Sequence, residues 1–150
     1  MSVAIVNHAP GSKLPLHRIK MTAQKILASL KQNRAELSVA LITNREIAKL
    51  NRKYRRHPKP TDVLSFPVGA LPEGQMRLLG DVVISVERAE EQAKACGWTL
   101  DQEIDRLLIH GILHLLGYDH ERSKKEAQVM RALERKISRT LCGNKAAALY

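Results

Sequence analysis

Three histidines in one short stretch are the residues of this chain most suited to chemistry. His110 and His114 stand four positions apart in an apolar run, which predicts a helix that projects both imidazoles from one face. Gly117 suits the left-handed conformation in which helices end, so the chain can turn back and bring His120 to the same point. Three imidazoles suit Zn²⁺ and leave its fourth tetrahedral position open to water. The pattern therefore predicts one catalytic zinc ion per chain, held by His110, His114 and His120.

The spacing of these histidines also limits the kind of chemistry. It equals that of the zinc-peptidase pattern His-Glu-x-x-His-x-x-Gly-x-x-His, except that position 111 is Gly. The glutamate that activates water in such peptidases is therefore absent, although a zinc amide or peptide hydrolase stays an alternative. Asp119 and Glu121 flank His120, and each could serve as a hydrogen-bond acceptor for a ligand or as a base. A further alternative is that two of the histidines are partly buried structural residues and the third is an unrelated surface residue. This alternative leaves the match to the zinc-peptidase spacing unexplained.

The composition indicates a negatively charged partner. The chain has 150 residues, which suits a single domain over 1–150 with a core of its own. Its 25 Lys and Arg against 15 Asp and Glu give a formal charge of +10, which favours nucleic acid or an anionic membrane surface. Aromatic residues are scarce, so phosphate contacts are expected rather than base stacking. There is no membrane span or signal peptide, and the two cysteines form no metal-binding pair, so we expect a reduced, cytoplasmic protein.

The elements that must position the histidines follow from the apolar periodicity. Apolar runs predict strands at 3–6, 37–42, 61–67 and 79–85, and the run 37–42 is expected to be buried on both faces. Helical spacing, together with capping residues, predicts helices at 16–31, 43–54, 85–96, 99–116 and 123–141. This order predicts an α+β (mixed α/β) fold: a central mixed sheet of about four strands, about five helices and a zincin-like three-histidine site. The right-handed crossover rule makes the first strands parallel.

The last predicted helix has an apolar and a basic side. Its buried stripe is predicted to be Val129, Met130, Leu133, Ile137 and Leu141. A solvated surface is the simplest interpretation of the other side. That side carries Arg122, Lys124, Lys125, Arg131, Arg135, Lys136 and Arg139.

A basic, proline-stiffened loop is the second candidate site. Residues 55–60 read Arg-Arg-His-Pro-Lys-Pro, and the prolines exclude a continuing helix. The guanidinium fork of Arg55 can grip a phosphate and stabilise charge that develops on it. Arg56 and Lys59 are candidates for further contacts with the same polyanion.

Three stretches resemble the YbeY family of bacterial ribonucleases. They are His-Gly-x-Leu-His-Leu-x-Gly-Tyr-Asp-His at 110–120, Leu-Gly-Asp-Val-Val-Ile-Ser at 79–85, and Tyr-Arg followed by Pro-Thr-Asp-Val-Leu-Ser-Phe-Pro within 54–67. The resemblance covers most of residues 40–137. It implies a metal-dependent, single-strand-specific endoribonuclease of 16S ribosomal RNA 3′-end maturation and ribosome quality control. It also implies zinc on the three histidines and a functionally important arginine at Arg55.

The residues and the resemblance lead to the same chemistry. A zinc ion on three histidines lowers the pKa of its bound water toward neutrality, so hydroxide is available without a glutamate base. Zinc can also polarise a phosphoryl oxygen while Arg55 neutralises charge on the phosphate. Whether hydroxide or the ribose 2′-hydroxyl attacks stays open, as do the cleavage position, the physiological metal and the oligomeric state. A ribosome-associated RNA-binding assembly factor with a structural metal is the alternative from another functional class.

Overall fold

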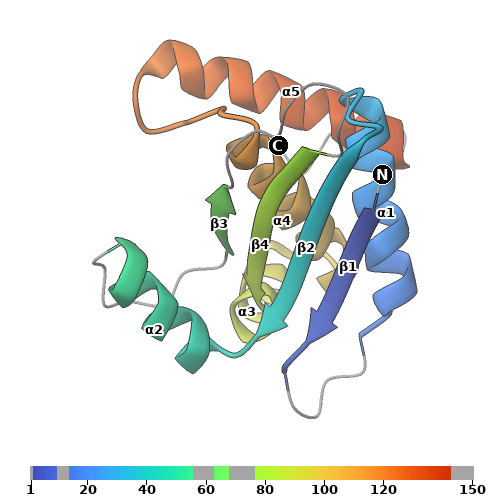
Figure 1. The fold of residues 1–150 in the computed structure, drawn as a ribbon. Coiled ribbons are helices and arrows are strands. Elements are labelled where there is room, and N and C mark those ends of the chain that lie inside the picture. Colours follow the sequence, from blue (N-terminus) through green and yellow to red (C-terminus); the bar gives the residue numbers. More distant parts are fainter. Residues whose placement is uncertain (1, 10–13, 56–62, 68–76, 143–150) are drawn as a thin grey trace.

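The computed structural model of the chain describes residues 2–9, 14–55, 63–67 and 77–142 (Figure 1). In chain order its elements are β1 (Ser2–Asn7), α1 (Leu16–Ser29), β2 (Ala35–Ile42), α2 (Asn44–Arg55), β3 (Val63–Pro67), β4 (Arg77–Ser85), α3 (Val86–Cys96), α4 (Leu100–Leu115) and α5 (Lys124–Cys142). These elements confirm the predicted fold of four strands and five helices. No described helix is long and apolar enough to cross a membrane.

The four strands form one mixed sheet with the order β1-β2-β4-β3. β1 pairs with β2 and β2 with β4 in parallel, as the crossover rule predicted for the first strands. β3 joins the edge antiparallel to β4, with Ser65 opposite Val82. The register between β2 and β4 shifts at Glu36 and Leu37, where Gly80 takes a φ of 130° that suits glycine.

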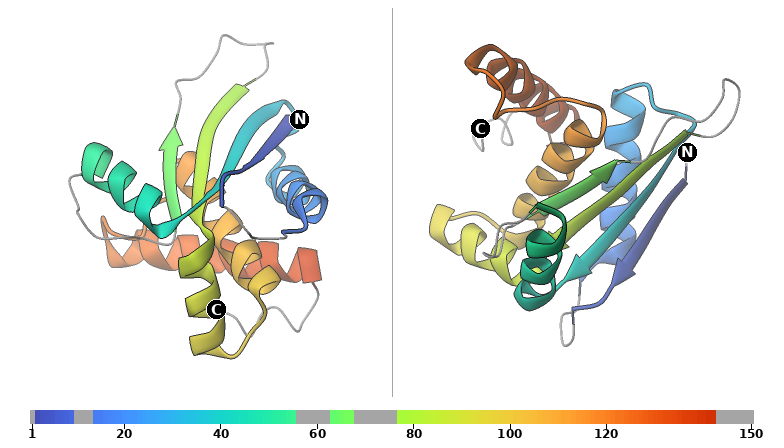
Figure 2. Two further views of the ribbon diagram at one scale, coloured as in Figure 1. Left: turned by 90° about the horizontal axis from the view of Figure 1, so that it is seen from below. Right: turned by 60° about the vertical axis from the view of Figure 1, so that its left-hand side comes forward.

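Helices cover the two faces of the sheet unequally. On one face, α1 packs on β1, and α4 packs on β3 and β4; α5 lies across α1 and α4 (Figure 2). The main core lies between this face and its helices. On the other face, α2 covers a small second cluster of Ile42, Ile47, Leu64 and Val83.

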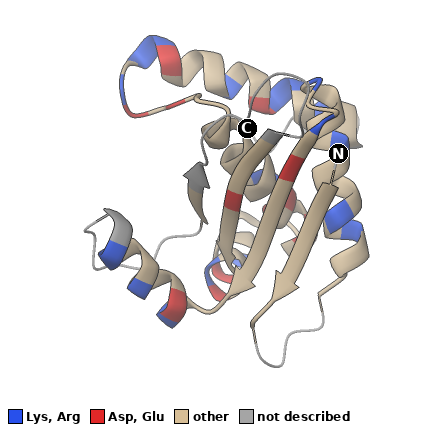
Figure 3. Cartoon of the chain, viewed as in Figure 1, with Lys and Arg blue, Asp and Glu red and all other residues tan. Residues whose placement is uncertain are grey.

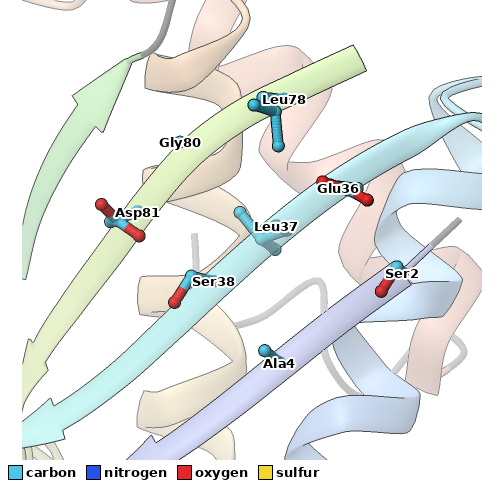
Figure 4. Close-up of a pocket in the computed structure, with 8 residues that line it drawn as sticks. All are labelled: Ser2, Ala4, Glu36, Leu37, Ser38, Leu78, Gly80 and Asp81. Atoms are coloured by element: carbon cyan, nitrogen blue, oxygen red, sulfur yellow. The ribbon is translucent and has the colours of Figure 1, made fainter. Parts of the chain in front are cut away.

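The predicted burial of 37–42 on both faces is wrong. Burial alternates along most of β2, because α2 covers only the end of the second face. The uncovered part of that face has a shallow hollow of about 270 Å³ (Figure 4). Its lining combines small and apolar residues with Glu36 and Asp81.

Helix α4 is the central helix of the fold, and both of its ends are specified by local contacts. At the start, the Thr99 hydroxyl accepts from the Gln102 amide, and the Gln102 side chain accepts from the Thr99 amide, so the predicted capping box is confirmed. At the end, the Gly117 amide donates to the His114 carbonyl and the Tyr118 amide to the Leu113 carbonyl. Gly117 has a φ of 98°, and these two bonds define a Schellman motif, which confirms the predicted turn.

Two buried carboxylates of α4, those of Asp105 and Glu103, are paired. The Arg18 guanidinium of α1 donates two hydrogen bonds to the Asp105 carboxylate, at 2.7 and 3.1 Å. The Glu103 carboxylate is fully buried and accepts from the Trp98 indole and from Arg106. Because burial is unfavourable for a charged carboxyl, it raises the pKa of Asp105, and the hydrogen bonds from Arg18 oppose this shift. The Arg18–Asp105 pair fixes α4 against α1, and the bond from Trp98 to Glu103 joins α4 to the segment that follows α3.

Two local predictions need correction. The sequence predicts Val129 in the buried stripe of the last helix, but Val129 is 47% exposed, whereas Met130 and Ile137 are buried. Val129 falls on the solvent side because the stripe follows every third or fourth residue from Met130. The sequence predicts Arg55 in a loop, but Arg55 is the last residue of α2. The prolines act only after Arg55, so the helix can include it.

Candidate functional site

The three histidines converge as the sequence predicted. His110 and His114 lie on the last turns of α4, and His120 lies in the connection to α5. The imidazole centroids are 4.6, 5.0 and 5.2 Å apart, and the Nε2 atoms of His110 and His114 are 3.1 Å apart. His110 and His114 are half-buried, and His120 is exposed. The cluster is therefore anchored in the core on one side and open to solvent on the other.

The donor set and its geometry fit a zinc ion. Tetrahedral zinc with Zn–N bonds of about 2.0–2.1 Å places two ligand nitrogens about 3.3 Å apart. One nitrogen of each histidine lies within 4.8 Å of the other two. Small side-chain rotations are enough to reach the tetrahedral spacing. Among the described residues, no further His, Cys, Asp or Glu joins this group, so these residues offer three of the four ligands of a tetrahedral site.

Glu134 of α5 determines which nitrogen of His110 faces the cluster. Its Oε1 lies 3.2 Å from His110 Nδ1, and the carboxylate is buried. When Nδ1–H donates to this carboxylate, Nε2 has no hydrogen and can bind a metal. Nε2 is also the atom nearest His114. The ring of His110 is thus held in the tautomer and orientation that a metal ligand needs.

The sequence interpretation did not find Glu134. A recognisable signal was present, because Glu134 lies four residues after Met130 and three before Ile137, on the side of α5 that packs inward. A carboxylate on a buried helical stripe requires a partner, and His110 is the one the structure shows.

Asp119 and Glu121 contribute less to the cluster than the sequence allowed. The Asp119 carboxylate accepts from the Glu121 amide at 2.8 Å and from Arg122 at 3.2 Å, so it holds the turn after α4. The backbone hydrogen bond from Glu121 lowers the pKa of Asp119, with Arg122 adding to the effect. A Glu121 oxygen is 3.8 Å from His120 Nε2, beyond hydrogen-bond distance.

Gly111 explains why the peptidase glutamate has no place here. A Cβ at this position would lie 2.8 Å from Val82 Cγ1 and 3.3 Å from Ser65 Oγ. The Ser65 hydroxyl also donates to the Gly111 carbonyl at 3.1 Å. Position 111 faces the sheet, and α4 lies too close to it for a longer side chain. A glutamate there would enter the core and not the metal site.

The basic loop lies largely outside the described residues. Arg56 and Lys59 belong to 56–62, and only the backbone of Arg55 is described, at the end of α2. Their roles therefore stay predictions.

Comparisons with known proteins extend the match beyond the histidines. The family model described as Endoribonuclease YbeY matches residues 4–142. An Endoribonuclease YbeY from Persephonella marina is 52% identical over 79% of this chain and 78% of its own length. The Endoribonuclease YbeY from Aquifex aeolicus is 48% identical over 81% of each chain.

A solved structure agrees with the fold. The solution structure of TM1509 from Thermotoga maritima matches with a TM-score of 0.60 and 30% identity, over 96% of this chain and 94% of that one. The family match spans the sheet, α4 with its histidines, and α5 with Glu134. This chain belongs to the YbeY family of endoribonucleases.

Proposed function

We propose that this chain is a zinc-dependent, single-strand-specific endoribonuclease of 16S ribosomal RNA 3′-end maturation and ribosome quality control. The observation that carries the proposal is the convergence of His110, His114 and His120, which no other His, Cys, Asp or Glu of the described residues joins. Family membership supports RNA as the substrate, and the charge of +10 supports a polyanion. In this proposal the chain acts as a single catalytic domain on the small ribosomal subunit in the cytoplasm.

The roles of the described residues follow from their positions. His110, His114 and His120 would hold the metal, and Glu134 keeps Nε2 of His110 directed into the cluster. A zinc ion bound there supplies a Lewis acid and lowers the pKa of bound water. The solvent-exposed side of the cluster, at His120, admits the phosphodiester. Core packing behind His110 and His114 keeps bulk water from that side.

Arg55 is proposed to stabilise charge on the scissile phosphate, with Arg56 and Lys59 contacting neighbouring phosphates. The support is the guanidinium fork and the match of the 54–67 stretch to the family. α2 ends at Arg55, and its chain leads into β3, which packs on the histidine helix α4.

The peptidase alternative loses its structural basis at Gly111, where the sheet excludes the required glutamate. An assembly factor with a structural metal stays a second candidate only if a fourth protein ligand completes the coordination.

Single-turnover cleavage of a single-stranded RNA at saturating enzyme tests the proposal. His114→Ala and chelation should each abolish cleavage, and elemental analysis should show zinc lost from the variant. Arg55→Lys should slow cleavage on the order of 10²–10³ with zinc content unchanged. Arg56→Ala, the matched control, should change the single-turnover rate little. Cleavage that persists without metal would refute the metal mechanism, and a peptide cut in place of RNA would refute the substrate.

A further inference from the structure

Helix α5 carries an excess of positive charge. Its sequence contains six Lys or Arg and two Glu. Glu134 is buried against His110, which leaves Glu126 as its only other carboxylate. Lys and Arg recur along α5 in Figure 3.

The basic residues of α5 divide between two sides of the helix. Lys124, Arg131, Arg135 and Arg139 follow one another by seven, four and four positions, so they form one stripe, here named the basic edge. Lys125 and Lys136 are eleven positions apart, about three turns, and lie on the other side of the exposed surface. All six residues are exposed.

The basic edge runs past the metal site. Glu134, which touches His110, directly precedes Arg135 and follows Arg131 by three positions. Arg131 is therefore one turn from the carboxylate that orients a metal ligand. Lys124 comes four residues after His120. From Lys124 to Arg139 the edge is about 22 Å long.

Three of the four charges of the edge are available to a ligand. Of the described residues, none places a carboxylate within ion-pair distance of Lys124, Arg131 or Arg139. The open face of the sheet instead presents Glu36 and Asp81 (Figures 3 and 4). A polyanion is attracted to α5 and repelled from the sheet.

We infer that the basic edge of α5 binds the phosphate backbone of the single-stranded RNA on one side of the cleavage point. The inference rests on the proposed function and adds the path of the strand. An anionic membrane fits less well, because the apolar side of α5, with Met130 and Ile137, is buried in the core. Only Val129 remains as a large exposed apolar residue on the described part of this helix.

The test measures binding of a single-stranded RNA as a function of salt, with the metal chelated so that no cleavage occurs. Lys124→Gln/Arg131→Gln/Arg139→Gln removes three charges and keeps good helix formers. The control, Lys94→Gln/Lys125→Gln/Lys136→Gln, removes the same charge from α3 and from the other side of α5. Thermal unfolding of both variants checks the fold.

Counterion release sets the expected size. Each lost phosphate contact lowers the slope of log K against log salt by about 0.7, so the edge variant should lose about 2 from the slope. Its affinity at about 0.1 M salt should fall about a hundredfold, and the control should stay within a few-fold of wild type.

Equal losses in the two variants, or wild-type slope in the edge variant, would overturn the inference. So would a variant that binds RNA normally but no longer binds phosphatidylglycerol vesicles, since the edge would then serve a membrane. Because binding is measured without metal, failure of the nuclease proposal is a separate outcome: the edge would bind RNA that the protein does not cut.

Discussion

Glu134→Ala should weaken zinc binding without unfolding the protein. The Glu134 carboxylate accepts from Nδ1 of His110 at 3.2 Å, so its removal releases the ring and lets the other tautomer form. Glu134→Gln keeps a carbonyl oxygen that can accept the same hydrogen bond but lacks the charge. We therefore expect its zinc affinity to lie between those of Glu134→Ala and the wild type.

The expected magnitude follows from this contact. Loss of a hydrogen-bonding partner behind a metal ligand costs about 10- to 100-fold in affinity, or about 1.4–2.7 kcal/mol. The free energy of unfolding should fall by about 1 kcal/mol, a typical net value for one hydrogen bond. The loss is this small because burying the carboxylate also costs desolvation free energy. Metal binding is therefore affected more strongly than folding.

Competition with a chromophoric chelator measures the zinc Kd, and urea unfolding of the metal-free protein measures stability. Glu126→Ala is the matched control, because it removes the same charge from α5 at a residue whose carboxylate faces Arg122. A zinc Kd for Glu134→Ala equal to that of Glu126→Ala would show that the carboxylate does not orient His110, and the reasoning would fail.

Three further predictions concern the support of α4. Gly111→Ala should destabilise the fold by about 1–3 kcal/mol, because the added methyl group overpacks against Val82. In denaturant unfolding, Val82→Ala in the same chain should recover part of this loss. Free-energy losses of the two substitutions that simply add would contradict the close contact. Arg18→Ala should cost about 1–3 kcal/mol at neutral pH, because Asp105 stays buried without its partner. The pKa of Asp105 is already raised in the fold, so ionisation of Asp105 opposes folding above that pKa. The stability lost in Arg18→Ala should therefore shrink as the pH falls, because protonated Asp105 needs no charged partner. A stability loss that grows in acid would contradict this. Thr99→Ala should cost about 1 kcal/mol in thermal unfolding through the lost cap, and an unchanged melting temperature would contradict it.

The sequence predicts the fold where local signals and periodicity agree. Capping residues such as Thr99 and Ser85, and the glycines at 97 and 117, mark helix ends that the structure confirms. The histidine cluster was predictable because all three histidines lie in eleven consecutive residues, and a helix followed by one turn determines their separation.

Features that depend on tertiary contacts were not predictable in the same way. An apolar run such as 37–42 does not reveal that one face of its strand is only partly covered, because coverage depends on where α2 packs. Glu134 was missed because its partner is 24 positions away on another helix. The steric reason for Gly111 needed Val82, which only the packing of α4 on β4 brings near.

The position of the metal site along the chain has a consequence for folding kinetics. His110 and Glu134 are separated by 24 positions, whereas pairs across the sheet such as Val39 and Val82 are joined only after a longer loop closes. Contacts that are local in sequence form faster than long-range strand pairs. An α4–α5 hairpin can therefore bring the three histidines and Glu134 together before the strands have paired. A metal ion that also bound such a partly folded chain would stabilise the native state by less than its native-state affinity implies.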